Sequence, residues 1–244
     1  MLRMKERIIP WIREYVKKSK AKGVVLGLSG GLDSAVVAVL CRKALGRDKV
    51  LALILPCHSQ KEDIKDALIL AKRFNIRVKS IDISGVFDNL IKILPPADKI
   101  SLGNIKARLR MLILYFFANR LRYLVCGTSN KSEIKTGYFT KFGDGASDIL
   151  PIGDLFKYQV KELAKDLGIP LAIIKKIPSA GLWLGQTDER ELGISYQELD
   201  DILERIEKDK RQLLSKEKVA KVKKMIKDSE HKRQLPKICY LTRR

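Results

Sequence analysis

Two adjacent glycines, flanked by hydroxyl and carboxylate side chains, lie between a short apolar run and an apolar helical pattern. The loop comprises Gly27, Leu28, Ser29, Gly30, Gly31, Leu32, Asp33 and Ser34. Glycines let the backbone turn sharply and bring its N–H groups close to an anion, and the next helix directs its positive end to the same place. Asp33 would repel a phosphate unless a cation lay between them, so its natural role is to bind Mg²⁺. The alternative is a plain turn in which Asp33 and Ser34 cap the helix.

Two longer segments, 129–158 and 178–195, are rich in Gly, Asp, Ser and Thr and show no strong periodicity. Long loops inside a compact domain are usually functional. We therefore expect substrate contacts in both segments.

Strand-like and helix-like patterns alternate along the chain, which favours an α/β fold. The expected architecture is a three-layer open parallel sheet, Rossmann-like, with helices on both faces. The expected strands are 24–28, 50–55, 78–83 and 123–126, and the expected helices are 5–18 (entered near Pro10), 34–45, 61–75, 104–122, 160–167 and 196–227. Thr128 follows the fourth strand at its carboxyl end, where open parallel sheets bind ligands.

Length and composition predict one globular domain over residues 1–244, since 45% of the residues are apolar. The apolar runs are too short to cross a bilayer, and Lys and Arg interrupt the apolar residues at the amino end, so no secretory signal is expected. The four cysteines are scattered without metal-ligand spacing. Reduced thiols in a cytoplasmic protein are therefore expected, not disulfides or a zinc site.

The formal net charge of +21 suggests a polyanionic partner, either nucleic acid or a nucleotide with several phosphates. A thermophile surface rich in Lys and Glu that leans basic is the alternative. The basic stretch 216–227 is interleaved with Glu and Asp and has few aromatic residues, which favours a solvated helix over a surface that stacks bases. Nucleic-acid binding is therefore not the function we expect.

The glycine loop resembles the SGGxDS loop of the ATP-pyrophosphatase family, whose members cleave ATP to AMP and pyrophosphate, and the sequence has no GxxxxGK[ST] motif. Further segments resemble those of NAD synthetases, in the same order and over nearly the whole chain. They are 103–111 (GNIKARLRM), 127–133 (GTSNKSE), 137–145 (GYFTKFGDG), 178–196 (PSAGLWLGQTDERELGISY) and 231–233 (HKR).

This resemblance implies a fold of the adenine nucleotide alpha-hydrolase type and a two-step ligase reaction. ATP adenylates the nicotinate carboxylate of deamido-NAD with release of pyrophosphate, and ammonia then displaces AMP to give NAD. The implied ATP contacts are the loop 27–34, Thr128, Lys157 and Ser179, with Asp33 and Glu133 as Mg²⁺ ligands. The implied deamido-NAD contacts are Arg108, Lys141, Asp148, His231 and Lys232. Asp33, Asp148 and Lys157 are the expected catalytic residues, Lys157 by offsetting charge on the pyrophosphate.

Residues 104–122 are unusually apolar for one surface helix, so we expect them to be buried on more than one side. In the family that this chain resembles, the region forms a two-fold dimer interface, which implies a homodimer. Because the glycine loop begins about one helix after Met1, no nitrilase-like glutaminase domain is expected, and free ammonia becomes the expected nitrogen donor.

Several of these assignments have simpler alternatives. Glu133 can be a loop carboxylate that faces solvent, and Arg108 can form an ordinary ion pair. Asp148 either orients ammonia or accepts a proton from ammonium, or it caps a loop. The sequence also departs from the family at Ser129, where bacterial relatives often carry Asp, and at Ser179, where some carry Thr.

Two other functions compete with this interpretation. A tRNA-modifying ATP pyrophosphatase would use the same loop and would explain the basic charge, but it usually carries an RNA-binding domain or a CxxC pair. A non-catalytic nucleotide-binding protein would bind ATP without releasing pyrophosphate, and the presence of Asp33 and Glu133 disfavours it.

Overall fold

The computed structural model describes residues 4–209 and 215–241. Four strands form one parallel sheet in the order β3-β2-β1-β4. They are β1 (Gly23–Gly27), β2 (Val50–Ile54), β3 (Arg77–Ser80) and β4 (Tyr123–Val125). Val24 of β1 pairs with Val50 on one side and with Leu124 on the other. The parallel sheet expected from the alternating patterns is thus confirmed.

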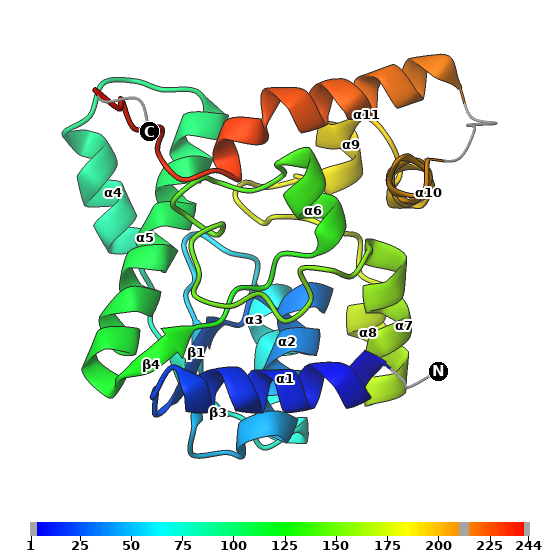
Figure 1. Cartoon of the computed structure of the whole chain (residues 1–244). Helices are drawn as coiled ribbons and strands as arrows, with labels where there is room; N and C mark the ends of the chain where they lie inside the picture. Colours follow the sequence, from blue (N-terminus) through cyan, green and yellow to red (C-terminus); the bar gives the residue numbers. More distant parts are fainter. Residues whose placement is uncertain (1–3, 210–214, 242–244) are drawn as a thin grey trace.

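Helices cover both faces of this sheet, which makes three layers (Figure 1). Val24 and Leu26 pack on one face, whereas Val25 packs on the other. The first face is covered by α1 (Met4–Lys18), α2 (Leu32–Leu45), α3 (Lys61–Arg73), α7 (Lys157–Leu167) and α8 (Leu171–Ile174), and the second by α4 (Ser84–Lys92) and α5 (Lys99–Leu121). Because both faces are buried, the central strands are apolar at nearly every position.

A second group of helices forms a smaller core of its own. It contains α6 (Lys131–Thr136), α9 (Asp188–Leu192), α10 (Tyr196–Glu207), α11 (Lys216–Asp228) and the 3-10 helix η1 (Glu230–Lys232). Leu199, Ile202 and Val222 are fully buried in this core, with Tyr196 and Phe156 beside them. Figure 1 shows the group in the upper half of the molecule, away from α1.

The expected helix 5–18 is confirmed as α1 (Met4–Lys18), but its expected entry near Pro10 is wrong, because Pro10 lies inside the helix. Other expected helix assignments are wrong as well. The segment 196–227 forms two helices, α10 and α11, and residues 210–214 between them lie outside the described residues. The short helices α6 and α9 stand in segments expected to be loops.

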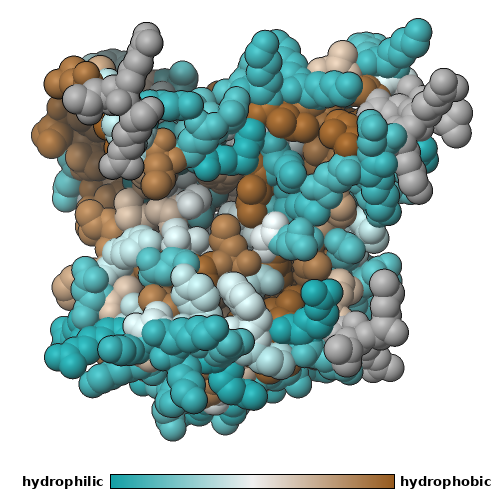
Figure 2. All heavy atoms as spheres, in the orientation of Figure 1, coloured by the Kyte–Doolittle hydropathy of each residue, from teal (hydrophilic) through white to brown (hydrophobic). Residues whose placement is uncertain are grey.

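Helix α5 packs on the sheet with one side only. Ile113 and Phe117 contact the buried cluster that contains Val25, whereas Leu112 and Phe116 are 61% and 56% exposed. The side of α5 that carries Leu112 and Phe116 is thus uncovered in the single chain, and its burial against a second copy stays a prediction. Figure 2 shows hydrophobic atoms at the surface on the upper left, in the region of α4 and α5.

None of the helices within the described residues is long and apolar enough to cross a bilayer. The cysteines Cys41, Cys57, Cys126 and Cys239 are all free thiols, as expected, and only Cys239 is exposed.

Candidate active site

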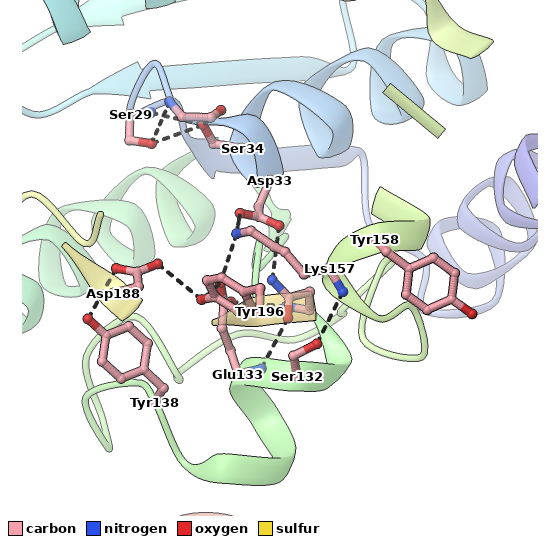
Figure 3. Close-up of polar contacts among 12 residues, drawn as sticks. Ser29, Asp33, Ser34, Ser132, Glu133, Tyr138, Lys157, Tyr158, Asp188 and Tyr196 are labelled. Carbon is pink, nitrogen blue, oxygen red and sulfur yellow. Dashed lines mark hydrogen bonds and ion pairs between the residues drawn. The ribbon is translucent and has the colours of Figure 1, made fainter. Parts of the chain in front are cut away.

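The glycine loop is closed by hydrogen bonds of its own serines (Figure 3). Ser34 Oγ accepts from the Ser29 N–H at 3.2 Å and donates to Gly31 O at 3.0 Å. Ser29 Oγ accepts from the Gly31 N–H at 3.2 Å. Gly31 is the N-cap residue of α2, and no side chain forms a capping hydrogen bond at this end of the helix. Asp33 and Ser34 therefore do not act as the helix cap that was the alternative to a phosphate site.

Gly30 is required by the shape of this loop. Its φ is +82°, and a Cβ built on it would lie 2.1 Å from the Asp63 carbonyl oxygen at the start of α3. Any side chain would clash with this backbone atom, and the positive φ disfavours L-residues as well. The close approach fixes the loop against α3.

Asp33, Glu133 and Lys157 converge from three different helices (Figure 3). Lys157 Nζ lies 2.6 Å from Asp33 Oδ2 and 3.4 Å from Glu133 Oε1. The Lys157 side chain is 4% exposed, and those of Asp33 and Glu133 are 17% and 15% exposed. Residues far apart in the sequence thus form one largely buried charge cluster beside the glycine loop.

The cluster brings two carboxyl groups to one ammonium group. Burial raises the pKa of Glu133 well above its usual range; Lys157 opposes this shift, and Asp33 adds to it. Burial alone would lower the pKa of Lys157, but Asp33 and Glu133 outweigh that effect and raise it. Lys157 therefore stays protonated between the two carboxyl groups, whereas Glu133 is ionised less readily than a free carboxyl group, and a bound cation would favour its ionised form.

Asn130 joins the two carboxylates. Its Nδ2 donates to Asp33 Oδ1 at 3.0 Å, and its Oδ1 accepts from the Glu133 N–H at 3.0 Å. Glu133 Oε2 in turn accepts from the Asn130 N–H at 3.1 Å, which completes a capping box at the start of α6. The Glu133 carboxylate is held by the Asn130 N–H and does not face solvent as a free loop carboxylate.

Asp188 and two tyrosines extend the cluster toward α9 and α10. Asp188 accepts from the Tyr196 hydroxyl at 3.0 Å and from the Tyr138 hydroxyl at 3.1 Å. The Tyr196 ring lies under Lys157, with Nζ 4.8 Å from its centroid. Burial, then the nearby carboxylates, raise the pKa of Tyr196, so its hydroxyl remains a donor. Tyr138 thus serves as a hydrogen-bond donor to Asp188.

The start of α7, which carries Lys157, is anchored to its neighbours. The Lys157 N–H donates to Ser132 Oγ at 3.1 Å, and Ser132 Oγ donates to Asp200 Oδ1 at 2.5 Å. Asp200 Oδ2 accepts from the Tyr158 N–H at 3.0 Å. These bonds link α6, α7 and α10, so Lys157 and Glu133 are placed by one connected unit.

Within residues 4–209 and 215–241, no group of three or more His, Cys, Asp and Glu side chains is arranged to hold a metal ion. Mg²⁺ is commonly held by one or two carboxylates together with phosphate oxygens of a substrate. Asp33 and Glu133 fit that role, because both carboxylates reach the same Lys157 Nζ beside the phosphate loop.

Four of the expected deamido-NAD contacts gather at a second place. Arg108 donates to Lys141 O at 3.3 Å, and Lys141 Nζ donates to His231 O at 2.5 Å. Lys232 Nζ donates to the carbonyls of Gly137 and Phe139 at 2.8 and 2.9 Å. Arg108 contacts a backbone carbonyl, which is not the carboxylate ion pair considered as its alternative.

Asp148 is bound by the sheet and by α5. Its Oδ2 accepts from the Val125 N–H at 2.7 Å and its Oδ1 from the Tyr115 hydroxyl at 3.3 Å. Burial and Asp148 raise the pKa of Tyr115 to about 12, so the hydroxyl remains protonated. By accepting from the Val125 N–H, Asp148 caps a backbone donor, as the structural alternative required. The residue is exposed, and its role toward ammonia stays a prediction.

The last two expected ATP contacts differ in their surroundings. Thr128 follows β4 beside β1, at the point where the order of the strands reverses. Ser179 is exposed between α8 and α9, and its Oγ accepts from the Gly181 N–H at 3.1 Å. Within the described part of the chain, Ser179 makes no hydrogen bond to the glycine loop.

The sequence interpretation assigned no role to Asn130, Asp188 or Tyr196, although all three contact the charge cluster. For Asn130 a signal existed, since Asn followed three residues later by Glu is a capping-box pattern. Asp188 and Tyr196 lie in the family-like segment 178–196, but nothing in that segment indicates their contacts with Tyr138 and Glu133, which lie far away in the sequence.

The sequence profile of the family described as NAD synthase matches residues 4–236. An NH(3)-dependent NAD(+) synthetase from Pyrococcus furiosus is 49% identical over 240 residues, covering 95% of this chain and 93% of the relative. The corresponding synthetase from Methanocaldococcus jannaschii is 50% identical over 242 residues, covering 94% and 93%.

Two solved structures of synthetases are similar to this chain in both fold and sequence. The NMN synthetase from Francisella tularensis has a TM-score of 0.90 at 41% identity, covering 97% of both chains. The NH3-dependent NAD synthetase from Campylobacter jejuni, in complex with the nitrate ion, has a TM-score of 0.86 at 38% identity, covering 97% of this chain and 98% of that one. The α/β fold is therefore of the adenine nucleotide alpha-hydrolase type. The match to the family profile over residues 4–236 and the 49% identity to the Pyrococcus furiosus synthetase over nearly both chains show that this chain belongs to the NAD synthase family.

Proposed function

We propose that this chain is an ammonia-dependent NAD synthetase, a carbon–nitrogen ligase that uses ATP and Mg²⁺. The observation that carries the proposal is the convergence of Asp33, Glu133 and Lys157 beside the glycine loop. Two carboxylates and one ammonium at the phosphates provide both a place for a cation and a positive charge opposite the leaving group.

In the first step, an oxygen of the nicotinate carboxylate forms a bond to the α-phosphorus of ATP while the bond to pyrophosphate breaks. The Gly31 N–H and the hydroxyls of Ser29 and Ser34 would hold phosphate oxygens. Lys157 offsets the charge that develops on pyrophosphate. Mg²⁺, when held by Asp33 and Glu133, would neutralise charge on the triphosphate.

In the second step, the nitrogen of ammonia attacks the acyl carbon of the adenylate, loses a proton and displaces AMP. Arg108, Lys141, His231 and Lys232 form the proposed dinucleotide side, where the Lys and Arg side chains suit phosphates. Asp148 would orient ammonia or accept a proton from ammonium. Oδ1, which accepts from the Tyr115 hydroxyl, is the oxygen that would contact ammonia, since Oδ2 accepts from the Val125 N–H.

A second candidate substrate is nicotinate mononucleotide. It is suggested by the likeness to the Francisella tularensis NMN synthetase, whose TM-score and identity exceed those of the Campylobacter jejuni NAD synthetase. The curated relatives that are 47–50% identical are NH(3)-dependent NAD(+) synthetases, which favours deamido-NAD. Both substrates present the same nicotinate carboxylate, so the chemistry above applies to either.

We also propose that the chain acts as a cytoplasmic homodimer of single-domain protomers. The exposed Leu112 and Phe116 on α5 support an apolar contact between copies, because removing apolar side chains from water is favourable.

The test is an incubation with ATP, Mg²⁺, ammonium and either deamido-NAD or nicotinate mononucleotide, in which the amide product, AMP and pyrophosphate are followed together. We expect stoichiometric NAD, AMP and pyrophosphate with deamido-NAD, and little turnover with ammonia-free glutamine. Faster amidation of the mononucleotide would transfer the proposal to the second candidate. Pyrophosphate release without either amide would contradict both.

A further inference from the structure

Lys176 lies where the glycine loop, α3 and the segment leading to Ser179 meet. Its Nζ is 2.7 Å from Asp63 Oδ1 and 2.6 Å from Asp66 Oδ2, both on α3. The same ammonium donates to Gly30 O at 3.3 Å. Burial by itself would lower the pKa of Lys176, but the two aspartates outweigh this effect and raise the pKa, so the ammonium group stays protonated.

The contact with Gly30 decides which way a phosphate-loop peptide faces. The described chain contains no cis peptide bond, so the Gly31 N–H points opposite to the Gly30 carbonyl. With that carbonyl held by Lys176, the Gly31 N–H faces the interior of the loop, where it donates to Ser29 Oγ. A reversed peptide would instead present a carbonyl oxygen to the phosphate.

The two aspartates add an electrostatic reason. The Asp63 backbone touches the loop so closely that no Cβ fits at Gly30. Two carboxylates beside a site for a triphosphate would repel it if they had no counter-charge. Lys176 contacts both of them, so it removes this repulsion at the position where the loop is most tightly packed.

We propose that Lys176 is a positioning residue for ATP, which keeps the Gly30–Gly31 peptide in the anion-binding orientation and neutralises the carboxylates of Asp63 and Asp66. The inference rests on the proposed ATP-dependent function and adds to it a residue outside the expected ATP contacts. Lys176 also lies shortly before Ser179, so it connects an expected ATP contact to the loop.

The experiment compares Lys176→Met with Lys175→Met, the same substitution at the adjacent exposed lysine. Steady-state rates are measured against ATP and against deamido-NAD, and the midpoint of thermal unfolding is measured without ligand. For Lys176→Met we expect the KM for ATP to rise about tenfold or more, as befits a lost charge-assisted contact. The KM for deamido-NAD should stay within about twofold, and Lys175→Met should match the wild type in all three measurements.

A second substitution, Lys176→Gln, separates the two roles and serves if Lys176→Met does not fold. Its amide can donate to Gly30 O but carries no charge, so the KM for ATP should lie between those of the wild type and the methionine variant. A KM for ATP equal to that of the wild type in the folded variants would overturn the proposal. Equal rises in both KM values together with a lower unfolding midpoint would also overturn it, since they would indicate that Lys176 only stabilises the fold. If the wild type itself forms no NAD, the proposed function has failed instead.

Discussion

Replacing Lys157 by methionine removes an ammonium group that lies 2.6 Å from Asp33 Oδ2 and 3.4 Å from Glu133 Oε1. Methionine has a similar length, so packing around the 4% exposed side chain is largely kept. What changes is the charge, because Asp33 and Glu133 then face each other without a cation. Breaking one partner out of a buried ion pair usually costs about 3–5 kcal/mol of folding stability.

The size of this loss depends on pH in a definite direction. The pKa of Glu133 is already raised by burial, and Lys157 is the main influence that lowers it. Without Lys157 the folded-state pKa rises further above its value in the unfolded chain. A carboxyl group with a raised folded-state pKa favours folding below its unfolded pKa, and this contribution is lost as the pH rises through the folded pKa. The deficit of the variant should therefore grow from acid to alkaline pH.

Urea unfolding of the wild type and Lys157→Met at about pH 5 and about pH 9 measures this difference, because linear extrapolation gives the free energy of unfolding for each. We expect a deficit of about 3–5 kcal/mol at the higher pH and a clearly smaller one at the lower pH. Lys165→Met, an exposed position on the same helix, should change stability by less than about 0.5 kcal/mol. An equal deficit at both pH values, or a larger one in acid, would refute the reasoning.

Three further predictions concern other parts of the proposed site. Asp33→Asn and Glu133→Gln should each slow pyrophosphate release by about 100-fold or more, and near-normal release in a coupled assay would exclude them as Mg²⁺ ligands. Leu112→Glu and Phe116→Glu should give monomers or aggregates by light scattering, and intact dimers from both would show that α5 is not the interface. Asp148→Asn should allow adenylation but slow amide formation in single-turnover experiments, with partial rescue by more ammonium. A change in thermal stability alone would leave Asp148 as a cap on the Val125 N–H.

The layered sheet could be predicted from the sequence because its signals are local. Val24–Leu26 and Val50–Ile54 read as buried strands on their own, and Gly46 marks the end of α2. Boundaries were less predictable where tertiary packing decides them. α1 continues through Pro10, and α6 exists because its capping box supplies the hydrogen bonds that a short helix lacks.

Motif resemblance predicted most residues of the candidate site, but the sequence did not predict how their side chains contact one another. Lys157 and Asp33 are 124 residues apart in the sequence, and no local pattern in either segment indicates their contact. Lys176 and Tyr196 have no motif that indicates their partners, which lie in the glycine loop and in α6. Motif resemblance singled out Asp148, whereas the hydrogen bonds of its two oxygens are known only from the fold.

The carboxyl-terminal HKR segment holds α6 through main-chain carbonyls. Lys232 donates to the carbonyls of Gly137 and Phe139, and Arg233 donates to those of Ile134 and Lys135. A carbonyl oxygen is the same atom whatever side chain its residue carries. Mutational drift at positions 134, 135 and 139 therefore leaves these acceptors in place, whereas a change of either basic residue removes donors that no neighbouring substitution restores. The contacts therefore constrain the identity of Lys232 and Arg233, whereas they place no constraint on the side chains of the residues that supply the carbonyls.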